Sequence, residues 1–216
     1  VTLARCLPPH RTKPAPRIDL NPWDGEDEIP GKAADGAKAL IDELHSALDP
    51  KAYRKAVALL AESEFIDIFG VENSLTPAMD LFTKLGYLGL TCRLNTDAYL
   101  QQIGAGHLPH GAVAVAFSHS GSSADTVKAL RLAKSHGAKT IAITNAIGAP
   151  LASWADVTLL TGRDSHTIYG NVIFSRVADT ALVDMLYMGV ILSGYGRFST
   201  ALDESGRMIR DRVFEN

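Results

Sequence analysis

The chain has 216 residues, of which 46% are apolar and 21% charged, and its formal net charge at pH 7 is −3. This composition predicts one well-packed domain with a tail, and the slightly acidic balance lacks the basic footprint of a domain that contacts nucleic acid. The two cysteines, Cys6 and Cys92, offer neither a disulfide framework nor metal-ligand spacing. With no signal-like leader and no long uncharged apolar run, we expect a cytoplasmic protein without a membrane span.

Prolines crowd the start of the chain. Six of the ten lie within the first thirty residues: Pro8, Pro9, Pro14, Pro16, Pro22 and Pro30. Because proline forbids long helices and favours extended backbone, residues 1–30 are predicted to be a linker or tail. Four basic residues precede Asp19 there, but a charge run alone is a weak signal, so a solvated tail is favoured over a nucleic-acid-binding arm. The folded domain is expected over residues 31–216.

The folded part begins with helical spacing and then alternates between two patterns. Two helices are predicted after residue 31, with Asp49 as the N-cap of the second and Pro50 in its first turn. Short apolar strands are predicted at 65–69, 91–94, 113–117, 140–144 and 157–160. Helices are predicted at 77–88, 97–108, 124–135, shortly after Pro150, and at 169–192. Strict alternation predicts an α/β fold, in which a five-stranded parallel sheet lies between two helical layers.

Polar loops follow two of these strands, at the edge where doubly wound sheets collect ligands. The segment 112–123, AVAVAFSHSGSS, changes abruptly from apolar residues to four serines and a glycine directly before a helix. Hydroxyls and the free N–H groups of a helix N-terminus are suited to an anion such as a phosphate. The serines are also explained if they only cap the helix at Ala124, but capping needs one serine and four are present.

This loop, with the following DTVKALRLAKSHGAKTIAITN and PLASWADVTLLT, resembles the sugar isomerase (SIS) domain of RpiR-type bacterial transcription regulators. The upstream FGVENS, PAMDLFTKLGYLG and the later SRVADTALVDMLYMGV resemble the same group, so the likeness covers about residues 34–194. The resemblance implies a flavodoxin-like SIS fold that binds a phosphorylated sugar. It also implies a DNA-binding helix-turn-helix on the N-terminal side, for which thirty proline-rich residues are too short.

The resemblance assigns roles to individual residues. Ser118, Ser120 and Ser123 would hold the phosphate, with Ser122 in the same loop and Ser74 reaching across from 71–74. Gly121 lets the backbone approach the ligand or adopt a positive φ.

Three neighbours of the serines are possible contacts to the sugar. They are Glu72, Asn73 and His119. Glu72 departs from the family, which usually has glycine there, and either faces solvent or contacts the sugar. Asn73 is equally explained as a turn residue, and His119 as a residue packed within its loop.

Three functions remain open at this point. The first is a non-catalytic sensor of a sugar phosphate, the second an aldose–ketose phosphate isomerase, and the third a sugar-binding chaperone or inhibitor that never contacts DNA. An isomerase needs a general base near the substrate. The candidates are Glu72, Asp97, His119 and His166. None falls in a recognised catalytic pattern, so we favour the sensor and expect no catalytic residue and no cofactor.

Other groups receive weaker assignments. His107 and His110 lack a third ligand, so no metal site is expected. Among the cations Lys84, Arg163 and Arg176, the last is the best placed to approach the pocket, although a salt bridge on the helix surface is the favoured explanation. The last predicted helix carries more apolar residues than one stripe needs: Leu182, Met185, Leu186, Met188, Val190 and Ile191. Together with the family resemblance, this predicts a homodimer or larger assembly.

Overall fold

Five short apolar strands form one parallel sheet in the computed structural model, which describes residues 23–162 and 175–210. The strands are β1 (Ile66–Phe69), β2 (Cys92–Leu94), β3 (Val113–Phe117), β4 (Lys139–Thr144) and β5 (Val157–Leu160). Their order in the sheet is β2-β1-β3-β4-β5, and every neighbouring pair is parallel. All five predicted strands are therefore confirmed, with boundaries that move by at most one residue.

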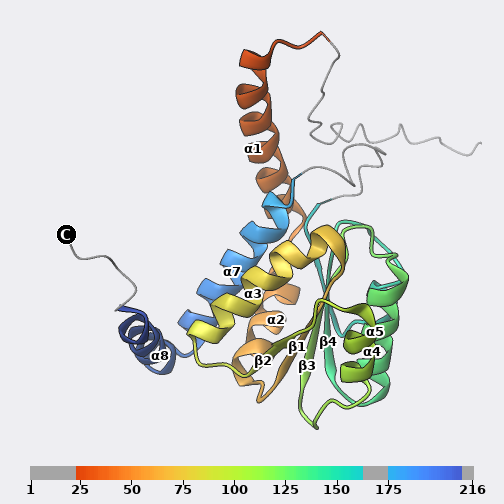
Figure 1. The fold of residues 1–216 in the computed structure, drawn as a ribbon, viewed down its shortest axis with the longest axis vertical. Coiled ribbons are helices and arrows are strands. Elements are labelled where there is room, and N and C mark those ends of the chain that lie inside the picture. The colour runs from red at the N-terminus through yellow and green to blue at the C-terminus, as the bar shows by residue number, and fades with distance from the viewer. Residues whose placement is uncertain (1–22, 163–174, 211–216) are drawn as a thin grey trace, which may run out of the picture.

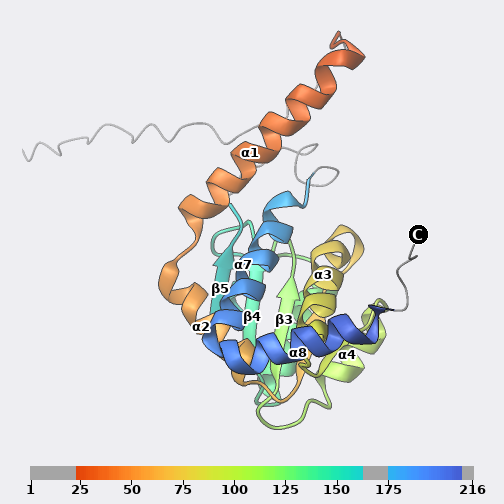
Figure 2. The same ribbon diagram turned by 90° about the vertical axis from the view of Figure 1, so that its left-hand side faces the viewer.

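Helices cover both faces of this sheet (Figures 1 and 2). One layer contains α2 (Pro50–Glu62), α3 (Leu75–Tyr87) and α7 (Val177–Ser193), and the other contains α4 (Ala98–Ala105) and α5 (Ala124–Ser135). The long helix α1 (Ile29–Ala47) packs against α7 by one end and projects past the sheet (Figure 2). Single 3-10 turns lie at Glu26–Glu28, Glu72–Ser74 and Ala152–Trp154. The predicted three-layer α/β sandwich is confirmed.

The two faces of the sheet carry side chains of different size. In β3, Val113, Val115 and Phe117 belong to the core beneath α2, α3 and α7. Ala114 and Ala116 alternate with them and face the core beneath α4 and α5. Side chains alternate across a strand, so one sequence builds both cores. Small side chains on the second face let α5, with its own Ala129 and Ala133, approach the strands closely.

The ends of the chain differ from expectation. Helix α1 starts at Ile29, with Pro30 in its first turn, so residues 26–30 are helical and not part of an extended linker. The last predicted helix begins at Val177 among the described residues, and the part of the prediction over 163–174 lies outside them. A further helix, α8 (Tyr195–Met208), was not predicted. It contributes one buried side chain, Phe198, and its apolar residues Tyr195, Phe198 and Leu202 recur at helical spacing, a pattern that the sequence analysis did not use.

Internal packing explains most of the apolar residues on α7. Leu182, Leu186 and Val190 are fully buried, whereas Met188 and Leu192 are 54% and 74% exposed. In the part of the chain that the structure describes, no single helix is long and apolar enough to cross a membrane. Only the α7–α8 pair reaches the required length and composition together, and it bends by 116°.

A buried ion pair fixes the edge strand β2 on β1. Asp67, fully buried in β1, is the register partner of Arg93 in β2. The guanidinium donates from Nε to Oδ1 at 3.0 Å and from Nη2 to Oδ2 at 2.6 Å. It also lies over the Phe65 ring and against Gly104, where a Cβ would be 2.6 Å from Nη2. Burial raises the pKa of Asp67 more than Arg93 lowers it.

Removing the cation should therefore be costly. We expect Arg93→Met to lower the free energy of unfolding by about 3–5 kcal/mol, because it leaves a buried carboxylate unpaired. The control is Lys38→Met, which breaks the exposed Lys38–Asp35 pair and should cost less than about 0.5 kcal/mol. Equal losses in urea unfolding of the two variants would contradict this role for Arg93.

Candidate functional site

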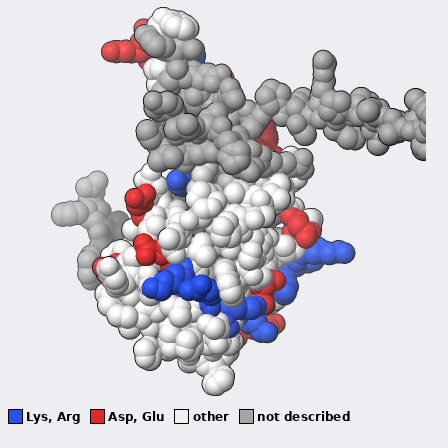
Figure 3. All heavy atoms as spheres, turned by 90° about the vertical axis from the view of Figure 1, so that its right-hand side faces the viewer, with Lys and Arg blue, Asp and Glu red and all other residues white. Residues whose placement is uncertain are grey.

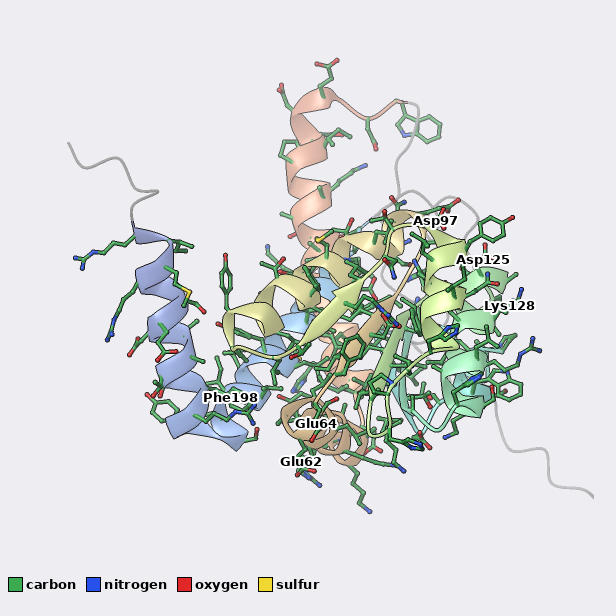
Figure 4. All side chains as sticks on the ribbon, turned by 60° about the horizontal axis from the view of Figure 1, so that its bottom comes forward. Glu62, Glu64, Asp97, Asp125, Lys128 and Phe198 are labelled. Carbon is green, nitrogen blue, oxygen red and sulfur yellow. The ribbon has the colours of Figure 1, made fainter. Side chains whose placement is uncertain are left out.

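The two predicted polar loops begin side by side at one edge of the sheet. Strands β1 and β3 are neighbours, with Phe69 paired to Ala116, so the segments that follow them leave the sheet together. Figure 4 shows the two edges: Asp97 and Asp125 mark the carboxyl edge, and Glu62 and Glu64 lie at the opposite one. The prediction that residues 71–74 and 118–123 lie at the same edge of the sheet is therefore confirmed, and the reach of Ser74 across to the serine loop stays a prediction.

Hydrogen bonds fold the serine loop into a compact turn. The Ser118 hydroxyl, which is buried, donates to Ser123 Oγ at 3.1 Å, and Gly121 N–H donates to Ser118 O at 2.9 Å. Ser120 Oγ accepts from Ser122 N–H, and the Ser122 hydroxyl donates to Ser120 O. The hydroxyls of Ser120 and Ser123 thus act as acceptors inside the loop and keep their own protons for an anion.

The turn has room only for glycine at its centre. Gly121 has φ +62, and a Cβ there would lie 2.3 Å from Ala149 Cβ and 2.8 Å from Thr144 Oγ1. Gly121 O accepts from Leu151 N–H at 2.9 Å, so this loop is fastened to the segment after β4. The predicted need for glycine is confirmed, in the form of a positive φ together with a close approach.

Helix capping does not explain the serines. Ser123 occupies the N-cap position of α5, yet its side chain makes no capping hydrogen bond. Ser74 stands at the same position before α3, also without a side-chain cap. Two serines therefore stand at the amino ends of two helices, where the helix dipole favours an anion. At α3 the N–H groups of Ser74 and Leu75 already donate to Val71 O and Glu72 O, so free N–H groups are expected mainly at α5.

A buried glutamine that the sequence analysis missed holds the first loop. Gln101, which is 1% exposed, donates from Nε2 to Gly70 O at 2.7 Å and accepts from Gly70 N–H at 3.3 Å. The same nitrogen donates to Asn95 O at 2.8 Å. Gly70 lets the turn pack closely, because a Cβ there would lie 3.1 Å from Ser74 O and press on it. Gln101 therefore ties α4 to the ends of both β1 and β2.

Glu72 and Asn73 are both exposed in the 3-10 turn before α3. Glu72 has φ +51 and is the one non-glycine residue with positive φ in the described part of the chain. A left-handed conformation costs an L-residue about 1–2 kcal/mol, which accounts for the glycine usual at this position in the family that the sequence resembles. The exposure fits the solvent-facing alternative for Glu72, and a contact to the sugar stays a prediction.

Two substitutions separate backbone strain from charge at Glu72. We expect Glu72→Gly to stabilise the fold by about 0.5–1 kcal/mol, because the relief of strain exceeds the extra chain entropy of glycine. Glu72→Gln keeps the strain and should leave the free energy of unfolding unchanged. Both should bind inorganic phosphate more tightly at low salt, since both remove a negative charge. Destabilisation by Glu72→Gly would contradict this account.

The remaining candidates are placed as follows. The Asp97 carboxylate is the N-cap of α4 and accepts from Leu100 N–H at 2.9 Å, so its geometry is that of a structural cap. His119 is half-buried, and its carbonyl accepts from Asn145 N–H. His107 Nδ1 donates to Ile103 O at 2.8 Å, and no group of three metal-ligating side chains occurs among the described residues. Arg163 and His166 lie outside the described residues.

Arg176 forms a pair at the start of α7 that the sequence analysis only partly anticipated. Its Nε lies 4.0 Å from Asp179 Oδ2, and both side chains are largely buried. The Thr161 hydroxyl donates to the same carboxylate. Burial raises the pKa of Asp179 to about 6, against the opposing effects of Arg176 and Thr161. Arg176 and Asp179 are single polar residues at the start of an apolar helix, and Thr161 is distant in the sequence. The sequence therefore contains no spacing that indicates this cluster.

This raised pKa predicts a specific pH dependence. Asp179 is ionised above pH 6 at a cost to the fold, and it takes up a proton in the folded state before it does so in the unfolded chain. The free energy of unfolding of the native chain, relative to Asp179→Asn, should thus rise by about 2 kcal/mol from pH 7 to pH 4. A difference that is constant over this range in urea unfolding would contradict the assignment.

Charge on the face formed by α4 and α5 is mixed. Figure 3 shows lysine and arginine side chains interspersed with acidic ones in a band across this face, without a single basic surface. Asp125, in the first turn of α5, accepts from Gln102 Nε2 on α4 at 3.0 Å, so its carboxylate is drawn toward α4.

Comparison with known proteins places this chain in a family. The model of the SIS domain matches residues 59–189. An uncharacterized HTH-type transcriptional regulator of Caldanaerobacter subterraneus is 30% identical over 86% of this chain and 66% of its own length. The chain spans 54–68% of the length of this and three further curated regulators that it matches.

Two solved structures share the fold. The NanR protein of Vibrio vulnificus complexed with ManNAc-6P aligns with a TM-score of 0.82 at 23% identity, over 88% of this chain and 72% of NanR. The sugar isomerase domain of an RpiR transcription factor from Sphaerobacter thermophilus aligns with a TM-score of 0.76 at 22% identity, over 83% of this chain and 99% of that domain.

Proposed function

The chain belongs to the SIS domain family, and we propose that it is the effector-binding part of a transcription regulator that senses a phosphorylated sugar. The observation that carries the proposal is the pair of serine-bearing loops after β1 and β3, where Ser74 and Ser123 stand at helix amino ends without capping them. The phosphate would be held by the hydroxyls of Ser74, Ser120 and Ser123, with Gly121 shaping the turn. Ser118 and Ser122 would join them by turning their hydroxyls away from Ser123 Oγ and Ser120 O. The NanR structure, which contains a sugar phosphate, supports the ligand class.

A sensor fits the described residues better than an isomerase does. An isomerase needs a general base that is free to accept a proton from the substrate. Asp97 is engaged in capping α4, and Glu72 is exposed on the first loop. Three curated relatives are named as HTH-type transcriptional regulators, which also favours a sensor over an isomerase. We therefore propose binding without conversion, in the cytoplasm and without a cofactor.

DNA contact and assembly belong to the same proposal. The helix-turn-helix named in the relatives would be carried by the part of a regulator that this chain does not span. A homodimer would bury the exposed apolar residues at the α7–α8 corner, of which Met188, Leu192 and Tyr195 are 54%, 74% and 65% exposed. Ligand would close the two loops on one another and reorient this dimer.

A thermal-shift panel tests the ligand class. The panel contains hexose, pentose, amino-sugar and acidic-sugar phosphates with their unphosphorylated parents. A binder at about 100 times its dissociation constant should raise the free energy of unfolding by about 2.7 kcal/mol, whereas its parent should not. Ser120→Ala should weaken that binder about tenfold or more, because each hydrogen bond to a charged oxygen contributes about 1.5–3 kcal/mol.

The matched control is Ser135→Ala, an exposed serine at the other end of α5, which should leave affinity unchanged. Full stabilisation of Ser120→Ala by the same ligand would contradict the proposed phosphate site. Incubation of each binder with the protein, followed by NMR, separates the two activities: an isomeric product would establish the enzyme and overturn the sensor.

A further inference from the structure

A second polar cluster lies at the same edge of the sheet, beyond β4 and β5. Asn145 directly follows β4, Gly162 follows β5 by two residues, and Glu43 belongs to α1. A Cβ built on Gly162 would lie 2.1 Å from Asn145 Oδ1 and 3.4 Å from the carboxyl carbon of Glu43. Three separate elements therefore bring an amide, a carboxylate and bare backbone to one point, and only glycine leaves space there.

The amide oxygen of Asn145 is buried without a hydrogen bond from the described residues. Asn145 is 8% exposed, and its Oδ1 has no partner there. An unpaired buried acceptor costs about 1–3 kcal/mol, so a ligand that donates to it recovers that cost. This orphaned oxygen, next to a carboxylate and over a glycine, points to a donor from outside the described chain.

Backbone hydrogen bonds attach this cluster to the serine loop. Asn145 N–H donates to His119 O at 3.0 Å, and Thr144 Oγ1 donates to the same oxygen at 3.1 Å. His119 lies between Ser118 and Ser120, so Asn145 sits directly beside the proposed phosphate site. A ligand anchored there by its phosphate has the rest of its body within reach of Asn145.

We propose that Asn145 and Glu43 form a subsite for the hydroxyl groups of the sugar, at the end away from the phosphate. Both side chains accept hydrogen bonds, the amide oxygen one or two and the carboxylate several, so they match a polyol that presents donors. A second anionic group on the ligand would be repelled by Glu43. The subsite therefore selects neutral sugar phosphates over acidic sugar phosphates and bisphosphates. This inference rests on the proposed function.

The experiment compares the affinity of the protein for sugar phosphates with its affinity for inorganic phosphate alone. Glucose 6-phosphate, ribose 5-phosphate, ManNAc-6P, 6-phosphogluconate and inorganic phosphate are titrated into the native chain by calorimetry and thermal shift. We expect a neutral sugar phosphate to bind more tightly than both inorganic phosphate and 6-phosphogluconate. Asn145→Ala should lower the affinity for that sugar phosphate about tenfold, as expected for a lost hydrogen bond in a buried site. The affinity for inorganic phosphate should change by less than about twofold.

Stability separates a ligand contact from a structural role. Because its oxygen has no partner in the free fold, Asn145→Ala should leave the unfolding midpoint unchanged or higher. Glu43→Gln should narrow the preference for the neutral sugar phosphate over 6-phosphogluconate, and the control Glu64→Gln, exposed at the opposite edge, should not.

The outcomes distinguish this inference from the proposed function. Equal weakening of sugar phosphate and inorganic phosphate by Asn145→Ala, or no weakening, overturns the subsite while Ser120→Ala still tests the phosphate loop. A native chain that binds 6-phosphogluconate most tightly, or no sugar phosphate more tightly than inorganic phosphate, also overturns the subsite. A lower unfolding midpoint for Asn145→Ala would assign that side chain a structural role instead.

Discussion

Parallel pairing of β1 with β3 is the constraint on which the site depends. Parallel neighbours need crossover connections, and here these run in opposite directions from the centre of the sheet, to β2 on one side and to β4 on the other. The segments after β1 and β3 therefore separate into two different helical layers, α3 and α5. Their helix amino ends therefore lie at the same edge of the sheet, at the point where the chain reverses direction across it.

Close packing around glycines then determines which polar groups lie at this edge of the sheet. Gly121 fits against Ala149 and Thr144, Gly70 fits under Ser74 O, and Gly162 makes space for Asn145. At each point the missing side chain lets two polar segments approach, so hydroxyl, amide and N–H groups gather where an ordinary residue would push them apart. Gln101 plays the same part through hydrogen bonds, holding Gly70 from both sides.

The features that were predicted correctly are those that a local sequence pattern determines. The five strands, the Asp49 cap and the serine loop are each encoded by consecutive residues, and each is found in the structure. Helix α8 is different because Gly196 and Gly206 lower its helix propensity and only Phe198 is buried. Its local pattern, with Tyr195, Phe198 and Leu202 at helical spacing, was overlooked. Gln101, Asn145 and Asp179 were also missed. Their importance comes from partners that are far away in the sequence, which no spacing reveals.

The central claim is that the loops after β1 and β3 hold a phosphate group. The most direct measurement is a titration of the ¹⁵N-labelled protein with inorganic phosphate, and then with a sugar phosphate, followed by amide chemical shifts. We predict saturable shifts at Ser74, at residues 118–123 and in the first turn of α5, with the same residues responding to both ligands. Shifts confined to the opposite edge around Glu64, or none at saturating sugar phosphate, would contradict the account.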